Sequence, residues 1–209
     1  MAVKEASTAA SVAASAVRPS ARERLLASAN ELFYNEGIHT VGIDRVIEHA
    51  GVAKASLYKT FGSKDALVQA YLDARQANVV RVITGAIDRY DTPRERLLAV
   101  FEGQAELFGR PGYRGCAFAR ASAESTPGDI AEQAAGAYRQ WVRALLTDLA
   151  AQAGVADPEV FGRQLQLLYE GSGQAARFEH GPAAAGLARA AAAVLLDAAL
   201  AAGPARSQG

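Results

Sequence analysis

The sequence predicts an all-α protein of about nine helices, and three observations support that prediction. Alanine, the residue with the highest intrinsic helix propensity, occupies 48 of the 209 positions. Apolar residues recur at helical spacing, as in Leu25, Ala29 and Leu32, and no window shows a convincing alternation of β-branched residues. Half of the residues are hydrophobic and only 21% are charged, which excludes a disordered chain and indicates a globular one.

Helix-breaking residues divide the chain into the predicted helices. The breaks fall at Gly37, Gly51, Gly62, Thr92 and Pro93, 110–115, 126–128, 154–158, and Gly181 and Pro182. Thr92, Thr126 and Asp157 each precede a proline, so each predicts a capped helix that begins at that proline. Ser63 predicts a simple cap for a helix over about 64–89, which spans about 39 Å at about 1.5 Å per residue and can join two domains.

The charges divide the chain at the start of that long helix. Basic and acidic residues balance at 22 each, so no overall positive field draws the chain to nucleic acid or membrane. Residues 18–64 carry seven basic and five acidic side chains, whereas residues 65–209 carry 14 and 16. Three of the four lysines, Lys54, Lys59 and Lys64, fall within eleven residues. Such a run is often only a solvated face, and it indicates a binding surface only if the fold gathers it.

The remaining composition bears on compartment. A single cysteine cannot form an internal disulfide, which suits a reducing, cytoplasmic environment. Residues 1–17 make a poor signal peptide and are predicted to be a disordered tail. The longest apolar stretch, 183–202, is mostly alanine and is interrupted by Arg189 and Asp197, so we expect no membrane span and no membrane partner.

Residues 40–61 have the pattern of two short helices joined by a tight turn. Thr40 can cap the first helix, and Gly51 can supply the left-handed conformation that L-residues avoid. The inward positions are Ile43, Val46, Ile47 and Ala50 on the first helix, with Val52 and Leu57 beneath the second. Two short helices so joined place the second helix in the major groove of DNA. Its outward side chains would be Lys54, Ser56, Tyr58 and Lys59.

Further positions extend this pattern to about fifty residues. They are the Leu25, Ala29, Phe33 stripe closed by Gly37, then Thr40-Val41, Ala50-Gly51-Val52, and Leu57-Tyr58-x-x-Phe61-x-Ser63-Lys64-x-x-Leu67. The stretch over about 21–71 resembles the DNA-binding domain of the tetracycline-repressor-like (TetR/AcrR) family of bacterial regulators. The resemblance implies a helix-turn-helix DNA-binding domain over 18–64. It also implies a larger helical ligand-binding and dimerisation domain over 65–209.

Two positions depart from the family pattern. Ile47 stands where the family commonly has alanine, and it would push the two helices apart unless the core repacks. Ala53 stands where a Ser or Thr commonly caps the second helix, a loss of about 1 kcal/mol in local helix stability. Both departures affect the expected tilt of the second helix rather than the fold.

The resemblance implies roles on DNA for six residues. Thr40, Tyr58 and Lys64 would bind phosphates, which set register and the salt-dependent part of the affinity, whereas Lys54, Ser56 and Lys59 would face base edges. Arg45 and His49 lie either near the DNA backbone or in solvent. Basic residues ahead of and in the first helix could reach an adjacent phosphate or minor groove; they are Arg18, Arg22 and Arg24.

A homodimer is expected because half-sites about 34 Å apart require two recognition helices related by symmetry. Two stripes are the candidates for its interface, and the resemblance points to the same two helices. They are Phe161, Leu165, Leu168 and Ser172 on one, and Leu187, Ala191, Val194, Ala198 and Ala201 on the other. Gly171, Gly173 and Ala176 would allow close helix approach. The alternative is that both stripes are buried within one subunit.

The segment 114–124 looks like a short helix that lines a ligand cavity in one branch of the family. Candidate lining residues are Phe101, Gln104, Phe108, Cys116, Phe118, Tyr138, Trp141, Tyr169 and Glu170. An apolar pocket with few polar groups would favour a hydrophobic or aromatic ligand. Alternatively, these aromatic residues are plain core. Cys116 is either a buried small residue or, acting without a resolving partner, a redox sensor.

The three histidines form no cluster at metal-ligand spacing, and no nucleophile elbow or phosphate-binding glycine loop is present. We therefore expect no metal, no cofactor and no enzyme activity. The leading hypothesis is a ligand-responsive regulator, a repressor that binds a palindromic DNA operator as a homodimer and is released by a small molecule. The alternative is a helical scaffold or small-molecule-binding protein whose front domain does not read DNA specifically.

Overall fold

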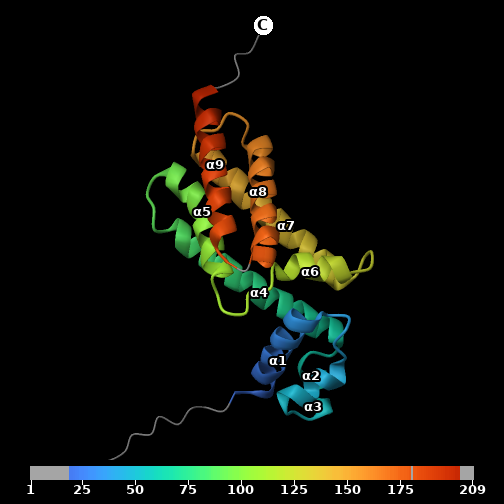
Figure 1. Ribbon diagram of the computed structural model, residues 1–209. Coiled ribbons are helices and arrows are strands. Elements are labelled where there is room, and N and C mark those ends of the chain that lie inside the picture. The colour runs from blue at the N-terminus through green and yellow to red at the C-terminus, as the bar shows by residue number, and fades with distance from the viewer. Residues whose placement is uncertain (1–18, 180, 203–209) are drawn as a thin grey trace, which may run out of the picture.

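The computed structural model of the protein describes residues 19–179 and 181–202, and within these ranges it is built of nine α-helices (Figure 1). They are α1 (Ala21–Glu36), α2 (Ile43–Ala50), α3 (Lys54–Thr60), α4 (Lys64–Ile87), α5 (Pro93–Phe108), α6 (Ala117–Glu124), α7 (Ile130–Gln152), α8 (Pro158–Glu179) and α9 (Ala183–Ala202). The all-α prediction is confirmed. The tail predicted over 1–17 lies outside the described residues.

Most of the predicted helix starts are confirmed. The Ser63 hydroxyl accepts from the Ala66 N–H at 3.1 Å, and that of Thr92 accepts from the Glu95 N–H at 3.3 Å. An Asp157 carboxylate oxygen accepts from the Val160 N–H at 3.1 Å. Unpaired N–H groups at these three helix starts are thus satisfied by the side chain that precedes the helix.

Two predicted helix starts are wrong. The helix expected at Pro127 begins instead at Ile130, because Gly128 adopts a left-handed φ of 86° and Asp129 provides the cap, accepting from the Glu132 N–H at 2.8 Å. Thr40 does not cap α2, whose N-cap is Gly42 and has no side-chain bond. Thr40 instead lies exposed in the turn before the helix.

Helices α1, α2 and α3 form one end of the molecule, which we call the head, and α4 leads from it into the rest, which we call the body (Figure 1). The expected domain boundary at 64/65 falls at the start of α4. The first turns of this helix pack against α1, where the rings of Phe33 and Tyr71 meet edge to face at 5.6 Å. Head and body therefore share one hydrophobic core through α4.

A side chain of α1 stabilises the turn between α2 and α3. Gly51 adopts the left-handed conformation, with a φ of 60°. The Arg24 guanidinium on α1 donates to the carbonyl oxygens of Ala50 at 3.3 Å and Gly51 at 2.9 Å. Ile47 is buried in the core, so its extra bulk is absorbed by packing. Ala53 precedes α3 without a side-chain cap, as the sequence indicates.

Helix α9 is long and apolar enough to cross a membrane by length and composition alone, with a mean hydropathy of 1.6. It packs instead against α5 and α8, and one row of its alanines is buried there. Two of its polar residues make ion pairs with α5: Asp197 with Arg94 at 2.9 Å, and Arg189 with Glu102 at 3.0 Å. These contacts make α9 a packed helix of the body.

Helices in the body approach most closely at two glycines. A Cβ at Gly103 on α5 would lie 2.8 Å from Ile83 Cδ1 and 3.0 Å from Ile83 Cα on α4. A Cβ at Gly162 on α8 would lie 3.1 Å from the Thr147 backbone on α7. Backbone atoms cannot yield cheaply, so both positions require glycine for packing.

We expect Gly103→Ala to lower the free energy of unfolding by about 1 to 3 kcal/mol, because overpacking against the α4 backbone exceeds the gain in helix propensity. Gly136→Ala is the matched control, since no atom lies within 4 Å of a Cβ at that exposed position on α7. It should raise the stability by about 0.5 to 1 kcal/mol. Urea denaturation followed by circular dichroism measures both, and a stabilised Gly103→Ala protein would contradict the packing account.

Candidate functional site

The exposed face of α3 is the candidate DNA interface. Leu57 is fully buried beneath this helix and fixes it on the head, while Tyr58 and Lys59 on the outer side are exposed. Tyr58 is 47% exposed, an unusual fraction for a tyrosine in a small domain. Ala55, which the sequence analysis did not single out, also lies on this face and leaves room beside Lys59 for another surface.

Two of the predicted base-reading residues are partly engaged within the head. The Lys54 ammonium donates to Asp44 on α2 at 2.7 Å, and this carboxylate raises the pKa of the lysine. Ser56 is half-buried, and its carbonyl accepts a hydrogen bond from the Thr60 hydroxyl at 2.6 Å. Lys59 is exposed and, unlike Lys54, forms no ion pair with any residue that the structure describes.

The other basic residues of the head are mostly bound inside it. Arg45 forms a two-point ion pair with Glu36, one bond of which measures 2.8 Å, and the His49 ring is 3.0 Å from the Ser28 hydroxyl. Arg24 braces the turn, so it is not available for DNA as the sequence analysis allowed. Arg22 lies over the Phe61 ring at 5.6 Å, and Arg18 lies outside the described residues.

Lys64 begins α4 and is half-buried, with its ammonium 6.0 Å from the centre of the Phe33 ring. Thr40 is exposed before α2. Lys64 therefore lies at the start of α4, where backbone N–H groups favour an anion, whereas Thr40 lies in the turn that precedes α2.

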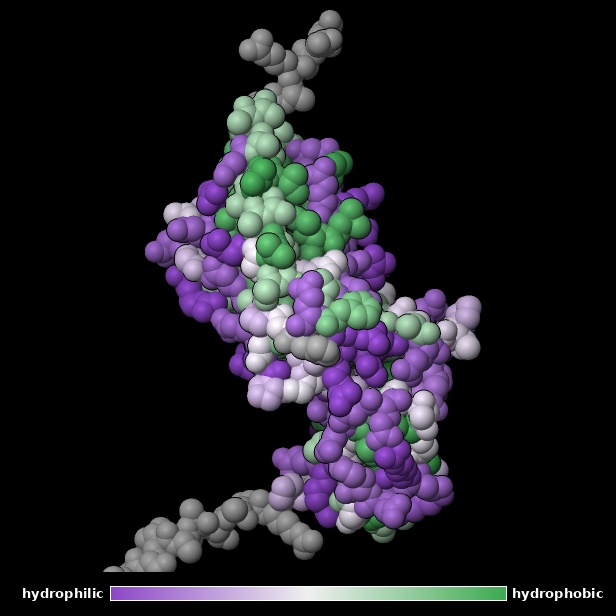
Figure 2. Space-filling view, viewed as in Figure 1, coloured by the Kyte–Doolittle hydropathy of each residue, from purple (hydrophilic) through white to green (hydrophobic). Residues whose placement is uncertain are grey.

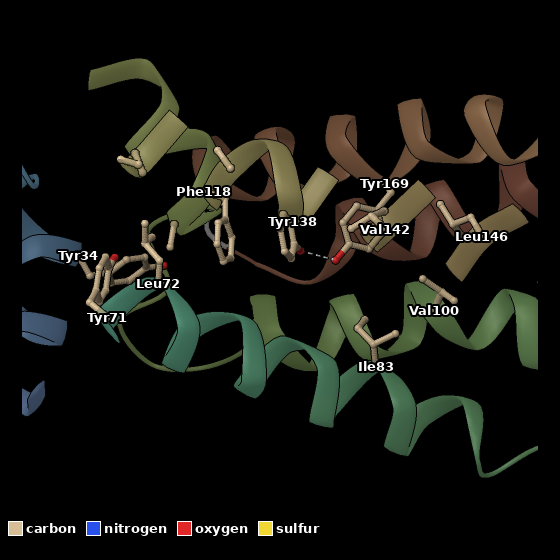
Figure 3. Packing of buried hydrophobic residues seen from close by; sticks show 14 of the residues in the cluster. Tyr34, Tyr71, Leu72, Ile83, Val100, Phe118, Tyr138, Val142, Leu146 and Tyr169 are labelled. Carbon is tan, nitrogen blue, oxygen red and sulfur yellow. Dashed lines mark hydrogen bonds between the residues drawn. The ribbon is translucent and has the colours of Figure 1, made fainter. Parts of the chain in front are cut away.

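A cavity of about 550 Å³ opens in the body beside the head. Six of the predicted residues line it, and so does the predicted anchor Glu170: they are Gln104, Phe108, Cys116, Phe118, Tyr138, Tyr169 and Glu170. The rings of Phe118 and Tyr138 stack in parallel, 4.1 Å apart, along one wall (Figure 3). A stacked aromatic wall favours a flat or apolar ligand.

Two predicted lining residues do not reach the cavity. Phe101 is fully buried in the core one turn before Gln104, the first α5 residue that lines the cavity. Trp141 packs against the Tyr138 ring at 5.8 Å and stands behind this wall rather than in it. For these two residues the alternative of plain core packing holds.

The polar groups in the deep part of the cavity satisfy one another. The Tyr138 and Tyr169 hydroxyls are 2.8 Å apart (Figure 3). The Gln104 amide donates to the Tyr169 carbonyl at 2.9 Å and accepts from the Ser172 hydroxyl at 2.9 Å. Burial raises the pKa of both tyrosines well above the ordinary value, so both stay neutral at physiological pH.

Sequence reasoning missed the part of the cavity that belongs to the head and α4. Tyr34 of α1 lines it together with Arg75, Asn78 and Val79 of α4. The Tyr34 hydroxyl accepts from the Arg114 N–H at 2.8 Å and donates to the Gly115 carbonyl at 2.8 Å. Tyr34 follows Phe33 and so lies beside the buried stripe of α1; that offset was the available signal.

Cys116 caps α6 and is partly exposed to the cavity. Burial raises the pKa of its thiol, which keeps the unreactive protonated form at neutral pH. This environment favours the small buried residue over the redox sensor.

Within the described part of the chain, an uncovered apolar face runs along α8 and α9 in the body (Figure 2). Among the described residues, the large hydrophobic side chains with more than a third of their surface exposed lie here, apart from Tyr58: they are Val160, Leu167, Phe178, Leu187, Val194, Leu195 and Leu200. The predicted α9 stripe, Leu187, Ala191, Val194, Ala198 and Ala201, is exposed in its entirety.

The α8 half of the predicted interface is wrong. Phe161, Leu165 and Ser172 are buried inside the protomer, because this side of α8 packs against the other helices of the body, and Leu168 is half-buried. The outward stripe of α8 lies one position earlier, at Val160, Leu167, Gly171 and Phe178. The 3.6-residue period correctly predicted a helix here, but it could not distinguish which of its two apolar stripes faces the core.

No group of three or more His, Cys, Asp or Glu side chains that could hold a metal ion occurs among the residues that the structure describes.

Comparison with known proteins relates the chain to transcriptional regulators. The model of bacterial regulatory proteins of the tetR family matches residues 25–71. The transcriptional activator FasR of Mycolicibacterium smegmatis is 36% identical over 85 residues, which are 41% of this chain. The chain covers 39% of the length of FasR and of two uncharacterised regulators of Mycobacterium tuberculosis that it also matches.

Two crystal structures match over most of the chain. The TetR-family regulator SCO4454 of Streptomyces coelicolor has a TM-score of 0.80 and 35% identity, over 86% of this chain and 95% of its own. The candidate TetR regulator sav143 of Streptomyces avermitilis has a TM-score of 0.76 and 34% identity, over 87% and 98%. Regulators of this kind are not enzymes, in agreement with the sequence analysis. The chain therefore belongs to the TetR family of transcriptional regulators, and α2 and α3 form its helix-turn-helix.

Proposed function

We propose that this regulator is a cytoplasmic, ligand-responsive repressor that binds a palindromic operator as a homodimer. The observation that carries the proposal is the cavity whose wall includes Tyr34 of the head. A molecule bound there contacts both the part that reads DNA and the part that pairs the subunits. Residues 18–64 would serve as the DNA-binding unit, and residues 65–209 as the sensing and dimerising unit.

On DNA, Lys59 is the leading base-reading residue because it is exposed and has no ion pair with any described residue. Ser56 is the second, from the flank of α3. Lys54 can contact a base only if it breaks its ion pair with Asp44, and the loss of that pair reduces what Lys54 adds to the DNA-binding free energy. Thr40, Tyr58 and Lys64 would bind phosphates around the recognition helix.

The dimer would form through the exposed stripes of α8 and α9. Two copies of one apolar face related by a two-fold axis give a self-complementary, closed interface. Large residues on each helix, such as Leu167, Leu187 and Val194, would anchor it, while the small residues between them allow close helix approach.

Release from DNA would follow from a population shift. An effector must bind the head arrangement that does not fit the operator more tightly than the one that does. The apolar and aromatic walls favour an effector with a hydrophobic or aromatic body. Because the polar groups of Tyr138, Tyr169 and Gln104 already bond to partners in the protein, the effector does not need to form hydrogen bonds with them.

The operator can be obtained by selection from a randomised duplex pool, followed by titration of fluorescent DNA. Lys59→Ala should weaken operator binding by about 1 to 3 kcal/mol and relax preference at the contacted base pair. Arg89→Ala, which removes an exposed arginine after α4 that is ion-paired with Glu106, is the control and should leave the affinity unchanged. Failure to select any sequence would instead support the scaffold protein whose head does not read DNA.

Lys64→Ala should weaken operator and unrelated DNA by the same factor. It should also reduce by about 1 the slope of log affinity against log salt, because one phosphate contact is lost. Titrations at several salt concentrations measure the slope. An unchanged slope would remove Lys64 from the DNA interface.

Leu187→Glu should convert the dimer to a monomer in size-exclusion chromatography with light scattering, since it places a charge on the apolar face. Ala137→Glu, at an exposed position on α7, is the control and should stay dimeric. A Leu187→Glu protein that remains a dimer would refute the α8–α9 interface.

A further inference from the structure

We propose that the cavity takes a ligand with an anionic group on an apolar or aromatic body, and that Arg75 on α4 binds this group in competition with its contacts to the head. This proposal rests on the proposed sensing function and adds to it the chemical class of the effector. It is argued from the charges that line the cavity and from the contacts of one guanidinium.

The cavity wall carries an excess of positive charge. Four charged residues line it: Arg75, Arg110, Arg139 and Glu170. Arg139 is neutralised by Glu170, to which it donates two hydrogen bonds at 2.8 and 3.2 Å. For Arg75 and Arg110, no carboxylate of the described part of the chain lies within 4.0 Å. Two arginines thus line a largely apolar cavity without a carboxylate partner in the described part of the chain.

The partners that these two arginines do have are weak and neutral. Arg110 donates to the Asn78 side-chain oxygen at 3.0 Å, an oxygen that also accepts from Arg81 at 2.9 Å. Arg75 donates to the carbonyl of Asn30 at 3.3 Å, a backbone oxygen within α1. A carboxylate or a similar anion would give either guanidinium shorter, charge-assisted hydrogen bonds.

One nitrogen of Arg75 makes no hydrogen bond to any residue that the structure describes. This atom, Nε, is buried, and buried N–H groups nearly always have a hydrogen-bond partner. An arginine offers Nε and one terminal nitrogen as a fork that fits two oxygens of an anion. The group left unsatisfied at the cavity wall is therefore a donor suited to an anion.

Arg75 also holds the head. Its guanidinium lies 3.7 Å from the centre of the Tyr34 ring, and its bond to Asn30 is a second contact with α1. Figure 3 shows Tyr34 beside Tyr71 at the end of the aromatic row that leads through Phe118 to Tyr138. An anion that turns Arg75 toward the cavity weakens both contacts with α1. Binding and the position of the head are then coupled through one side chain.

The test uses two fluorescent probes that share an aromatic body. Anilinonaphthalene sulfonate carries an anionic group, and N-phenylnaphthylamine is its neutral analogue. Each probe is titrated into the full-length protein. Arg75→Met should weaken the affinity for the sulfonate about tenfold or more, while the affinity for N-phenylnaphthylamine should stay within about twofold of the wild-type value. Arg110→Gln, at an exposed position, gives a second variant with the same expected direction should Arg75→Met fail to fold.

Two controls locate the effect. Arg81→Gln removes a nearby positive charge that binds the same Asn78 but does not line the cavity, and it should change neither affinity. Gly173→Leu should weaken both probes, because a Cβ there would already touch the wall, 3.9 Å from Phe108 Cζ and 4.0 Å from the Tyr113 hydroxyl, so the rest of a leucine side chain would occupy cavity space. Probes unaffected by Gly173→Leu bind elsewhere, and that result would overturn the proposal.

Equal losses of both probes in Arg75→Met, or unchanged sulfonate binding in a folded Arg75→Met protein, would also overturn the proposal; if that variant does not fold, unchanged sulfonate binding by Arg110→Gln would do so. The probe titrations involve no DNA, so they stand or fall apart from the proposed function. A parallel titration of operator DNA with saturating sulfonate tests coupling: DNA affinity should fall in wild type and change less in Arg75→Met. Intact sulfonate binding with no DNA binding at all would refute the regulator and leave the anion site in place.

Discussion

The hydroxyl of Tyr34 connects the head to the body through two hydrogen bonds. It is a group of the head, yet its partners are the N–H of Arg114 and the carbonyl of Gly115, in the loop that leads to α6. Gly115 has a φ of 102°, a conformation that other residues rarely adopt, so the loop geometry is itself constrained. A shift of the head must therefore move this loop or break two buried hydrogen bonds, and the loop is part of the cavity wall.

The cavity is built so that its two ends have different tasks. Deep in the body, Gln104, Ser172, Tyr169 and Tyr138 satisfy one another, which gives a rigid wall that needs no rearrangement to accept an apolar body. Near the head, Arg75 bridges α4 and α1 and retains an unused buried donor. The part of the cavity that can form new hydrogen bonds to a ligand, at Arg75, is thus also the part that contacts the head.

The same separation appears on the surface. Hydrophilic residues dominate the head, while the exposed apolar side chains gather along α8 and α9 in the body (Figure 2). In the proposed function, DNA reading and subunit pairing would therefore use different surfaces of one chain. Helix α4, which starts at Lys64 and carries Arg75 along the cavity, would connect the two as a rigid element.

Sequence patterns predicted the local features well, because those features depend on neighbours in the chain. The caps at Ser63, Thr92 and Asp157 and the left-handed Gly51 are of this kind. Two local predictions failed, because the N-cap of α2 is Gly42 rather than Thr40 and that of α7 is Asp129 rather than Thr126. The other failures required knowledge of tertiary packing. Helical periodicity could not tell which stripe of α8 faces inward, and it placed Phe161 and Leu165 on the wrong side. Tyr34 and Arg75 lie 41 positions apart in the sequence, and nothing local indicates their contact.

The most direct test of this account measures the distance between the two heads of the dimer. Glu48 is exposed on α2, so a nitroxide can be attached at Glu48→Cys after the single native cysteine is removed by Cys116→Ala. Pulsed electron paramagnetic resonance then measures the distance between the two labels. The account predicts that saturating anilinonaphthalene sulfonate changes the distance distribution, and that Arg75→Met abolishes most of the change. Identical distributions with and without the probe, in a protein whose cavity binds it, would contradict the coupling of cavity and head.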